Sequence, residues 1–133
     1  MHYKLFVFDL DETLWSVSEG LCSMLKPPFN MTAPDRLETN EGFWIELKPG
    51  VHKLFDFLKE QDVYISLASR NDHKPTMEIL SEFGLSDGLT YPQICWQPKD
   101  KMLNKILRRI KKRDKVTIKP DEVFFLDDWP DNI

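Results

Sequence analysis

Three acidic side chains follow a short apolar segment near the start of the chain. Residues 3–8 read YKLFVF, and Asp9, Asp11 and Glu12 come within four positions of that segment. An apolar strand belongs in a buried sheet, where a charge without a partner is costly. Carboxylates this close repel one another unless a positive group lies among them. This spacing therefore indicates a site at which carboxylates meet a cation.

Polar side chains also stand at the ends of three later apolar segments. They are Ser69, Arg70 and Asn71 after residues 63–68, Lys99 after residues 91–96, and Asp127 and Asp128 after residues 122–126. Together with the first acids they offer carboxylates, a hydroxyl and an ammonium. A hard cation such as Mg²⁺ takes a few carboxylates together with waters and substrate oxygens. The set is suited to holding a divalent cation and a phosphoryl group.

The elements between these strand ends have the periodicity of helices. Apolar side chains recur at helical spacing over residues 51–60, 74–83 and 100–112. Strands that alternate with helices predict an α/β fold with three layers, a Rossmann-like parallel sheet covered by helices on both faces. Ligands of such sheets gather at the carboxyl ends of the strands. Residues 16–48 are mixed and contain several prolines, so we expect a loop insertion with at most a β-hairpin and a short helical turn.

Composition limits the class of protein. The chain has 133 residues and a formal net charge of −4, which predicts a single soluble domain over residues 1–133 without a general attraction to nucleic acid or anionic membranes. No apolar run reaches the length of a membrane span. Two cysteines, Cys22 and Cys95, are too few for a disulfide framework, so a cytoplasmic location is expected. The basic run at 105–115 is interpreted as a solvated helix face.

The polar motifs together resemble the haloacid-dehalogenase-like (HAD) hydrolase superfamily. Its four signatures occur in order as Asp9-Leu10-Asp11-Glu12-Thr13, Ser69, Lys99 and Asp127-Asp128. Within the superfamily the chain is most similar to the small, capless magnesium-dependent phosphatases. The likeness covers nearly the whole chain, through DLDETLW, PPF, LKPGV, LASRND and FFLDDWPDNI. The fold implied is HAD-like and capless, with a small loop or hairpin insertion.

The resemblance implies a role for each motif residue. Asp9 would be the nucleophile, and Asp11 would protonate the leaving oxygen and later deprotonate the attacking water. Ser69, Arg70 and Lys99 would bind the phosphoryl group, and Lys99 would offset its negative charge. The Mg²⁺ ligands would be Asp9, the backbone carbonyl of Asp11, and Asp128. Thr13, Asp127 and Asn132 would support the site.

Several points stay open at the level of sequence. Lys101 competes with Lys99, which we prefer because Leu103 and Ile106 then follow at helical spacing. The family often has an acid where this chain has Asn132, and Asp131 lies one residue early. Trp15 and Trp129 flank the acidic motifs and are expected in the core, with the substrate entrance as the alternative. The chain stops at Ile133, one strand and one helix before the family's usual fold ends. Either the chain is truncated or the edge of the sheet is closed differently, and an uncovered edge strand would invite pairing with another molecule.

The predicted function is hydrolysis of a phosphomonoester through an aspartyl-phosphate intermediate with Mg²⁺ as cofactor. The open cleft implied by a capless fold suits a phosphoprotein, as in a protein-tyrosine phosphatase, or a sugar phosphate. One alternative is a non-catalytic HAD-like binding scaffold or a fragment of a larger enzyme. Phosphomutase or dehalogenase chemistry is a further alternative, although dehalogenation does not require an acid such as Asp11 to protonate a leaving alkoxide. No nucleic-acid or membrane partner is expected.

Overall fold

A four-stranded parallel sheet forms the centre of the computed structural model, which describes residues 2–127. Its strand order is β7-β6-β1-β8, and the neighbouring strands run parallel throughout. The strands are β1 (Leu5–Phe8), β6 (Tyr64–Ser69), β7 (Gln93–Ile94) and β8 (Val123–Leu126). Because all four point the same way, their carboxyl ends meet at one edge of the sheet.

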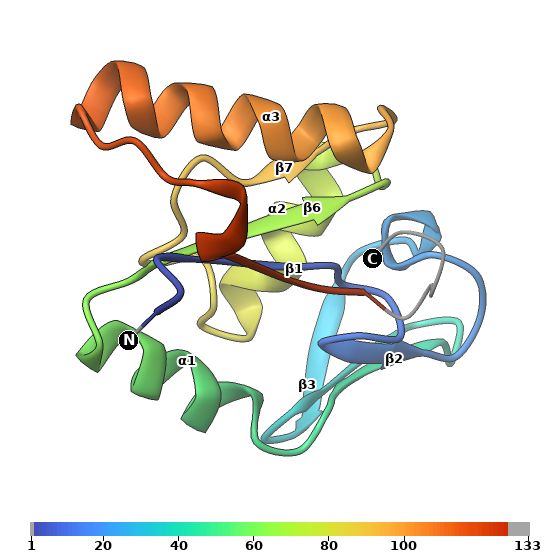
Figure 1. Ribbon diagram of the computed structural model, residues 1–133. Helices are drawn as coiled ribbons and strands as arrows, with labels where there is room; N and C mark the ends of the chain where they lie inside the picture. The colour runs from blue at the N-terminus through green and yellow to red at the C-terminus, as the bar shows by residue number, and fades with distance from the viewer. Residues whose placement is uncertain (1, 128–133) are drawn as a thin grey trace.

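Helices cover both faces of this sheet. The helix α3 (Lys99–Arg109) lies on one side, and α1 (Val51–Glu60) and α2 (His73–Glu82) pack on the other (Figure 1). Successive β1 side chains alternate between the two layers, since Phe6 and Phe8 belong to the core with α1 and α2, whereas Leu5 and Val7 pack with α3. A strand buried on both faces is a continuous apolar run, as LFVF is. The predicted three-layer α/β fold is confirmed.

The insertion contains more strand than the sequence predicts. A second, antiparallel sheet has the order β2-β5-β4-β3, and the short 3₁₀ turn η1 (Cys22–Met24) follows β2. Its strands are β2 (Trp15–Val17), β3 (Phe29–Ala33), β4 (Arg36–Thr39) and β5 (Trp44–Leu47). These strands are short, and β2 pairs with β5 across nearly thirty residues of chain. Local periodicity carries too little signal for such segments, so the expectation of at most one hairpin is wrong.

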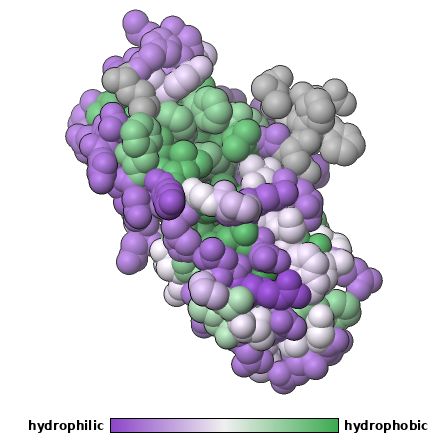
Figure 2. Space-filling model, turned by 90° about the horizontal axis from the view of Figure 1, so that it is seen from below, coloured by the Kyte–Doolittle hydropathy of each residue, from purple (hydrophilic) through white to green (hydrophobic). Residues whose placement is uncertain are grey.

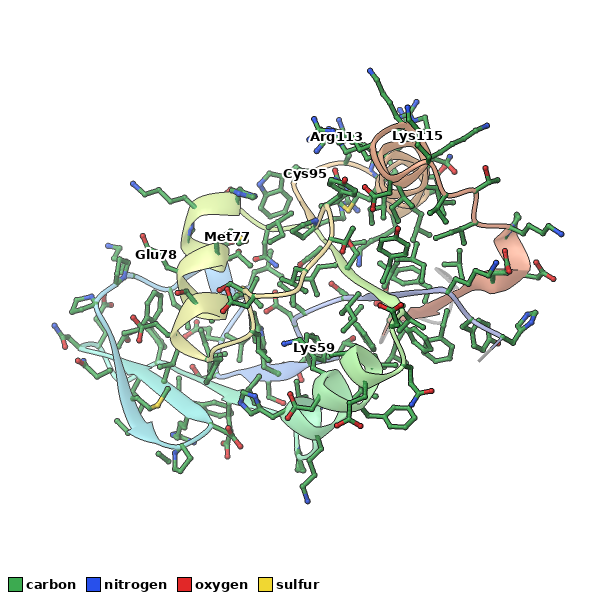
Figure 3. All side chains as sticks on the ribbon, turned by 90° about the vertical axis from the view of Figure 1, so that its left-hand side faces the viewer. Lys59, Met77, Glu78, Cys95, Arg113 and Lys115 are labelled. Atoms are coloured by element: carbon green, nitrogen blue, oxygen red, sulfur yellow. The ribbon has the colours of Figure 1, made fainter. Side chains whose placement is uncertain are left out.

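The other predicted elements differ only at their ends. The third parallel strand covers two residues instead of the expected 91–96, since Pro92 has no N–H to donate and Tyr91 has a left-handed φ of 48°. The helix predicted for 100–112 continues past α3 into a π-helical turn, Ile110–Asp114. In the basic run this turn carries Arg113, and Lys115 follows it. Both are exposed at the surface beyond α3 (Figure 3).

Apolar side chains gather on the face of the molecule that carries α1 (Figure 2). On α1, Leu54 is 37% and Phe57 is 49% exposed, and the ring of Tyr3 lies edge-on against Phe6 and Phe124.

Within residues 2–127, β8 pairs only with β1 and forms an edge of the parallel sheet. Pairing of this edge with another molecule stays a prediction. No helix in the described part of the chain has the length and apolar composition needed to cross a bilayer.

Candidate active site

The carboxyl ends of the parallel strands surround a pocket of about 300 Å³. Six residues predicted for the site line this pocket, namely Asp9, Asp11, Ser69, Arg70, Lys99 and Asp127. They come from the loop after β1, the end of β6, the first turn of α3 and the end of β8. Residues that are up to 118 positions apart in the sequence are therefore brought together by the parallel topology.

A largely buried lysine links two carboxylates that line the pocket. The Nζ atom of Lys99 lies 3.1 Å from Oδ1 of Asp9 and 3.2 Å from Oδ2 of Asp127. The three side chains are 11%, 15% and 1% exposed, so water screens their charges weakly. Lys101, the alternative that the sequence left open, is exposed and does not line the pocket. The structure thus places Lys99 at the site, because it is the residue at which α3 begins.

Burial changes the acidity of Asp9. It raises the pKa of this carboxyl from its ordinary 3.8 to about 6, against the opposing effects of the Lys99 ammonium and of the Leu10 backbone N–H. Asp127 adds to the rise through charge repulsion and a hydrogen bond. The Leu10 N–H donates to Oδ1 of Asp9 at 2.8 Å, the same oxygen that Lys99 contacts. Two fixed donors on one oxygen orient the carboxylate toward the pocket.

Asp11 is held from the side of the insertion. A tight turn with a left-handed φ of 62° at Glu12 returns the chain, so that the Trp15 indole N–H donates to Oδ1 of Asp11 at 2.8 Å. The backbone N–H of Cys22 reaches the same oxygen at 3.3 Å. Trp15 itself is fully buried, which confirms its predicted place in the core. Trp129 lies outside the described residues.

Asn71, to which the sequence motifs gave no role, lies between two residues of the site. It is 1% exposed and donates from Nδ2 to Asp11 Oδ2 at 3.1 Å and to Ser69 Oγ at 2.8 Å. On the other side of the amide, Asn71 Oδ1 accepts a hydrogen bond from the Ser23 hydroxyl, with 2.7 Å between the two oxygens. Its position two residues after Ser69 is a signal that sequence reasoning could have used. Ser23, 48 residues away in the 3₁₀ turn η1, gives no comparable signal.

The sequence model of the family described as acid phosphatase matches residues 2–133. The chain belongs to the acid phosphatase family. The match extends over nearly the full length, and it confirms the resemblance to HAD-like phosphatases that the motifs indicated.

One solved structure supports the fold of this acid phosphatase family member. It is the N-terminal part of the protein BF1531 from Bacteroides fragilis, containing a phosphatase domain, in complex with Mg. The TM-score is 0.64 at 19% sequence identity, and the match covers 98% of this chain and 32% of the other. The chain therefore spans about a third of that structure's length. No curated protein matches the sequence.

Other residues predicted for the site have weaker structural support or none. Thr13 does not line the pocket, and its buried hydroxyl has no hydrogen-bond partner among residues 2–127. Asp128 and Asn132 lie outside the described residues. The roles proposed for these three residues stay predictions.

The acidic residues at the pocket offer oxygen ligands of the kind that Mg²⁺ prefers. Within residues 2–127 no three His, Cys, Asp or Glu side chains converge in a way that could hold a metal ion. Mg²⁺ often binds through one or two protein carboxylates, with waters and phosphate oxygens completing its shell. Asp9 offers a buried carboxylate at the pocket surface, where a cation would offset the unfavourable burial of its charge. The donor set therefore fits a magnesium ion that the protein holds through few of its own ligands.

Cys22 is not suited to act as a nucleophile at this candidate site. Burial raises the pKa of its thiol, and the neighbouring Asp11 carboxylate raises it further. The thiol therefore stays protonated near neutral pH, and only a thiolate is an effective nucleophile. The Cys22 side chain contacts Asn71 Oδ1 at 3.6 Å and Thr76 Oγ1 at 3.8 Å, so its role is to pack η1 against α2.

Proposed function

We propose that this protein is a Mg²⁺-dependent phosphatase that hydrolyses phosphomonoesters through an aspartyl-phosphate on Asp9. The observation that carries the proposal is the pairing of Asp9 with Lys99 in a pocket that Ser69 and Asp11 also line. A nucleophilic carboxylate, a cation, a hydroxyl and a second carboxylate together match the needs of phosphoryl transfer. Membership of the acid phosphatase family supports this chemistry.

In the first step the Asp9 carboxylate attacks phosphorus. A bond forms between an Asp9 oxygen and phosphorus while the bond from phosphorus to the ester oxygen breaks. The leaving oxygen takes its proton from the Asp11 carboxyl, which lines the same pocket. The Lys99 ammonium and the Ser69 hydroxyl stabilise the charge on the phosphoryl oxygens that do not react.

In the second step the acyl phosphate is hydrolysed. Asp11 now accepts a proton from water, the water oxygen attacks phosphorus, and the Asp9 carboxylate is regenerated as phosphate leaves. The residues that would hold Mg²⁺ are Asp9, through its carboxylate, Asp11, through its backbone carbonyl, and Asp128. When bound, the ion supplies positive charge that favours phosphate binding and the charge distribution of the transition state.

The substrate proposed is a phosphate ester whose leaving group stays partly outside the pocket. A volume of about 300 Å³ is at the lower end of the range for small-molecule sites. The exposed Arg70 lies on the pocket wall, where its guanidinium could bind a phosphate oxygen or an anionic group of the leaving part. A phosphotyrosyl peptide and a sugar phosphate both meet this description.

The proposal is tested by assaying a panel of phosphomonoesters with two lysine variants. Lys99→Ala should lower kcat/KM by about 10²- to 10³-fold, because it removes the buried cation beside Asp9. Lys101→Ala is the matched control and should stay near wild type, because Lys101 is exposed and outside the pocket. If wild type hydrolyses no ester of the panel in the presence of Mg²⁺, the proposal is wrong. Equal losses in the two variants would contradict the role of Lys99.

Asp11→Asn should reveal the acid through its dependence on the leaving group. Loss of general acid–base assistance lowers rates by about 10²- to 10⁴-fold. The loss should be largest for alkyl phosphates and smallest for p-nitrophenyl phosphate, because a nitrophenolate leaves without much help from a proton. The measurement is kcat for wild type and variant over esters of graded leaving-group pKa. A uniform loss over the series would exclude Asp11 as the acid.

A further inference from the structure

The side chain of Asn71 connects two residues that the proposed mechanism uses for different purposes. Its Nδ2 donates to Asp11 Oδ2 at 3.1 Å and to Ser69 Oγ at 2.8 Å. One amide nitrogen carries two hydrogens, so both of its donors are used in these contacts. Because Asn71 is 1% exposed, water does not compete effectively for them. The amide thus joins the proposed proton donor to the proposed phosphate-binding hydroxyl.

The orientation of this amide is determined by the donors that surround its oxygen. The backbone N–H of Ser23 can only donate, and it lies 3.3 Å from Asn71 Oδ1. The Ser23 hydroxyl accepts from the Asp72 backbone N–H at 3.1 Å and donates to Asn71 Oδ1 at 2.7 Å. The flipped amide would place NH₂ against these donors and its oxygen against the Asp11 carboxylate. The assignment of oxygen toward Ser23 and nitrogen toward Asp11 is therefore unambiguous.

This orientation fixes the polarity of the Ser69 hydroxyl. Since Asn71 Nδ2 can only donate, Ser69 Oγ must accept in their 2.8 Å contact. The hydroxyl proton of Ser69 then has to point elsewhere, and residues 2–127 show no hydrogen bond in which it donates to a protein acceptor. Ser69 lines the pocket, so a substrate oxygen can accept this proton. The donors run in one direction, from the Asp72 N–H through Ser23, Asn71 and Ser69 to the pocket.

We propose that Asn71 is a positioning residue for phosphate-ester hydrolysis, which directs the Ser69 hydroxyl proton into the pocket and holds the Asp11 carboxylate beside it. This inference rests on the proposed function. It also gives the insertion a part in the reaction, because Ser23 belongs to η1 and sets the orientation of the amide. Asn71 itself does not bond to the reacting atoms in this scheme and acts through its two neighbours.

The first test is Asn71→Ala, assayed with an alkyl phosphate and with p-nitrophenyl phosphate. We expect KM to rise for both esters, because the Ser69 hydroxyl is free to turn away from the phosphoryl group. We expect kcat to fall about 10- to 100-fold for the alkyl ester, as for the loss of a hydrogen bond to a charged group, and much less for the nitrophenyl ester. A purely structural role would lower the active fraction and change kcat equally for both esters, and that result would overturn the inference.

The coupling to Asp11 is tested by a double-mutant cycle. In an Asp11→Asn background, Asn71→Ala should no longer change the ratio of the two kcat values, since no acid is left to position. The same factor in both backgrounds would contradict the inference. Asn104→Ala is the matched control, because Asn104 is exposed on α3 and should retain wild-type kinetics.

A second variant keeps the inference testable if Asn71→Ala fails to fold. Ser23→Ala leaves Asn71 in place but removes the hydroxyl that holds its oxygen, so it should change KM and the kcat ratio in the same direction by a smaller factor. Kinetics of Ser23→Ala identical to wild type would argue against the chain of donors. If wild type is active, Asp9→Asn is inactive, and the Asn71 and Ser23 variants keep the KM and the kcat ratio of wild type, only this inference is refuted. An inactive wild type would refute the proposed function, and the inference with it.

Discussion

Asp9→Asn should lower phosphate-ester hydrolysis by at least about 10⁴-fold, the scale expected when a nucleophile is removed. The amide is nearly isosteric with the carboxylate, but it cannot form the aspartyl-phosphate. The fold should survive, because the substitution replaces a buried charge whose desolvation already raises the carboxyl pKa to about 6. Lys99 keeps its contact with Asp127 at 3.2 Å. The measurements are kcat/KM over the ester panel and the melting temperature of the metal-free protein.

A variant that neutralises an acid outside the pocket provides the control for Asp9→Asn. Asp56→Asn removes the same charge from an exposed position on α1, remote from the pocket, and should leave kcat/KM unchanged. When an ester with a labelled phosphoryl group is used, the label should be found covalently bound to wild type and not to Asp9→Asn. Activity of Asp9→Asn within about tenfold of wild type would remove Asp9 from the role of nucleophile.

Removal of divalent cations should abolish activity and lower the melting temperature. Carboxylates lie close together at the carboxyl edge of the sheet, where the largely buried Lys99 ammonium lies between those of Asp9 and Asp127. A ligand that binds only the folded state stabilises it by mass action, by about 2.7 kcal/mol when Mg²⁺ is at one hundred times its Kd. Addition of Mg²⁺ after EDTA treatment should therefore restore both activity and melting temperature. Mn²⁺ should substitute for it at a site built from oxygen ligands.

Two variants separate specific metal binding from a general effect of salt. Asp128→Ala should reduce the activation by Mg²⁺ and the rise in melting temperature together, because the proposed ligand is removed. Asp56→Asn should retain both responses, since its carboxylate lies outside the pocket. If EDTA leaves activity and melting temperature unchanged in wild type, and no divalent ion alters either, the proposed metal site is wrong.

The architecture of the central sheet could be predicted because local patterns encode it. The apolar run LFVF reports burial on both faces, and the helical spacing of Val51, Phe55 and Leu58 reports a helix with one buried side. Alternation of such strands and helices admits few topologies other than a parallel sheet. In a parallel sheet the strand ends share an edge. That rule alone predicts that Asp9, Ser69, Lys99 and Asp127 meet, as they do at the pocket.

The position of the two lysines relative to Asp9 required the tertiary structure. Lys99 and Lys101 carry the same side chain two residues apart, and the helical spacing of Leu103 and Ile106 favours Lys99 without showing which of the two reaches Asp9. The point at which α3 begins decides the question, because it directs Lys99 to Asp9 and leaves Lys101 exposed. Helix ends depend on the loop that leads into them, and sequence patterns locate such ends least precisely.

The sequence by itself determined the central sheet, the edge at which the site lies and the residue types available there. Only the tertiary structure showed the second sheet and the contacts through which Ser23 and Cys22 reach Asn71 and Asp11. The physical reason is the difference between the two kinds of information. Burial of apolar side chains recurs with the period of a strand or helix and can be read along the chain. A hydrogen bond between residues 48 positions apart depends on how two distant segments lie relative to each other in the fold, and it leaves no periodic pattern in the sequence.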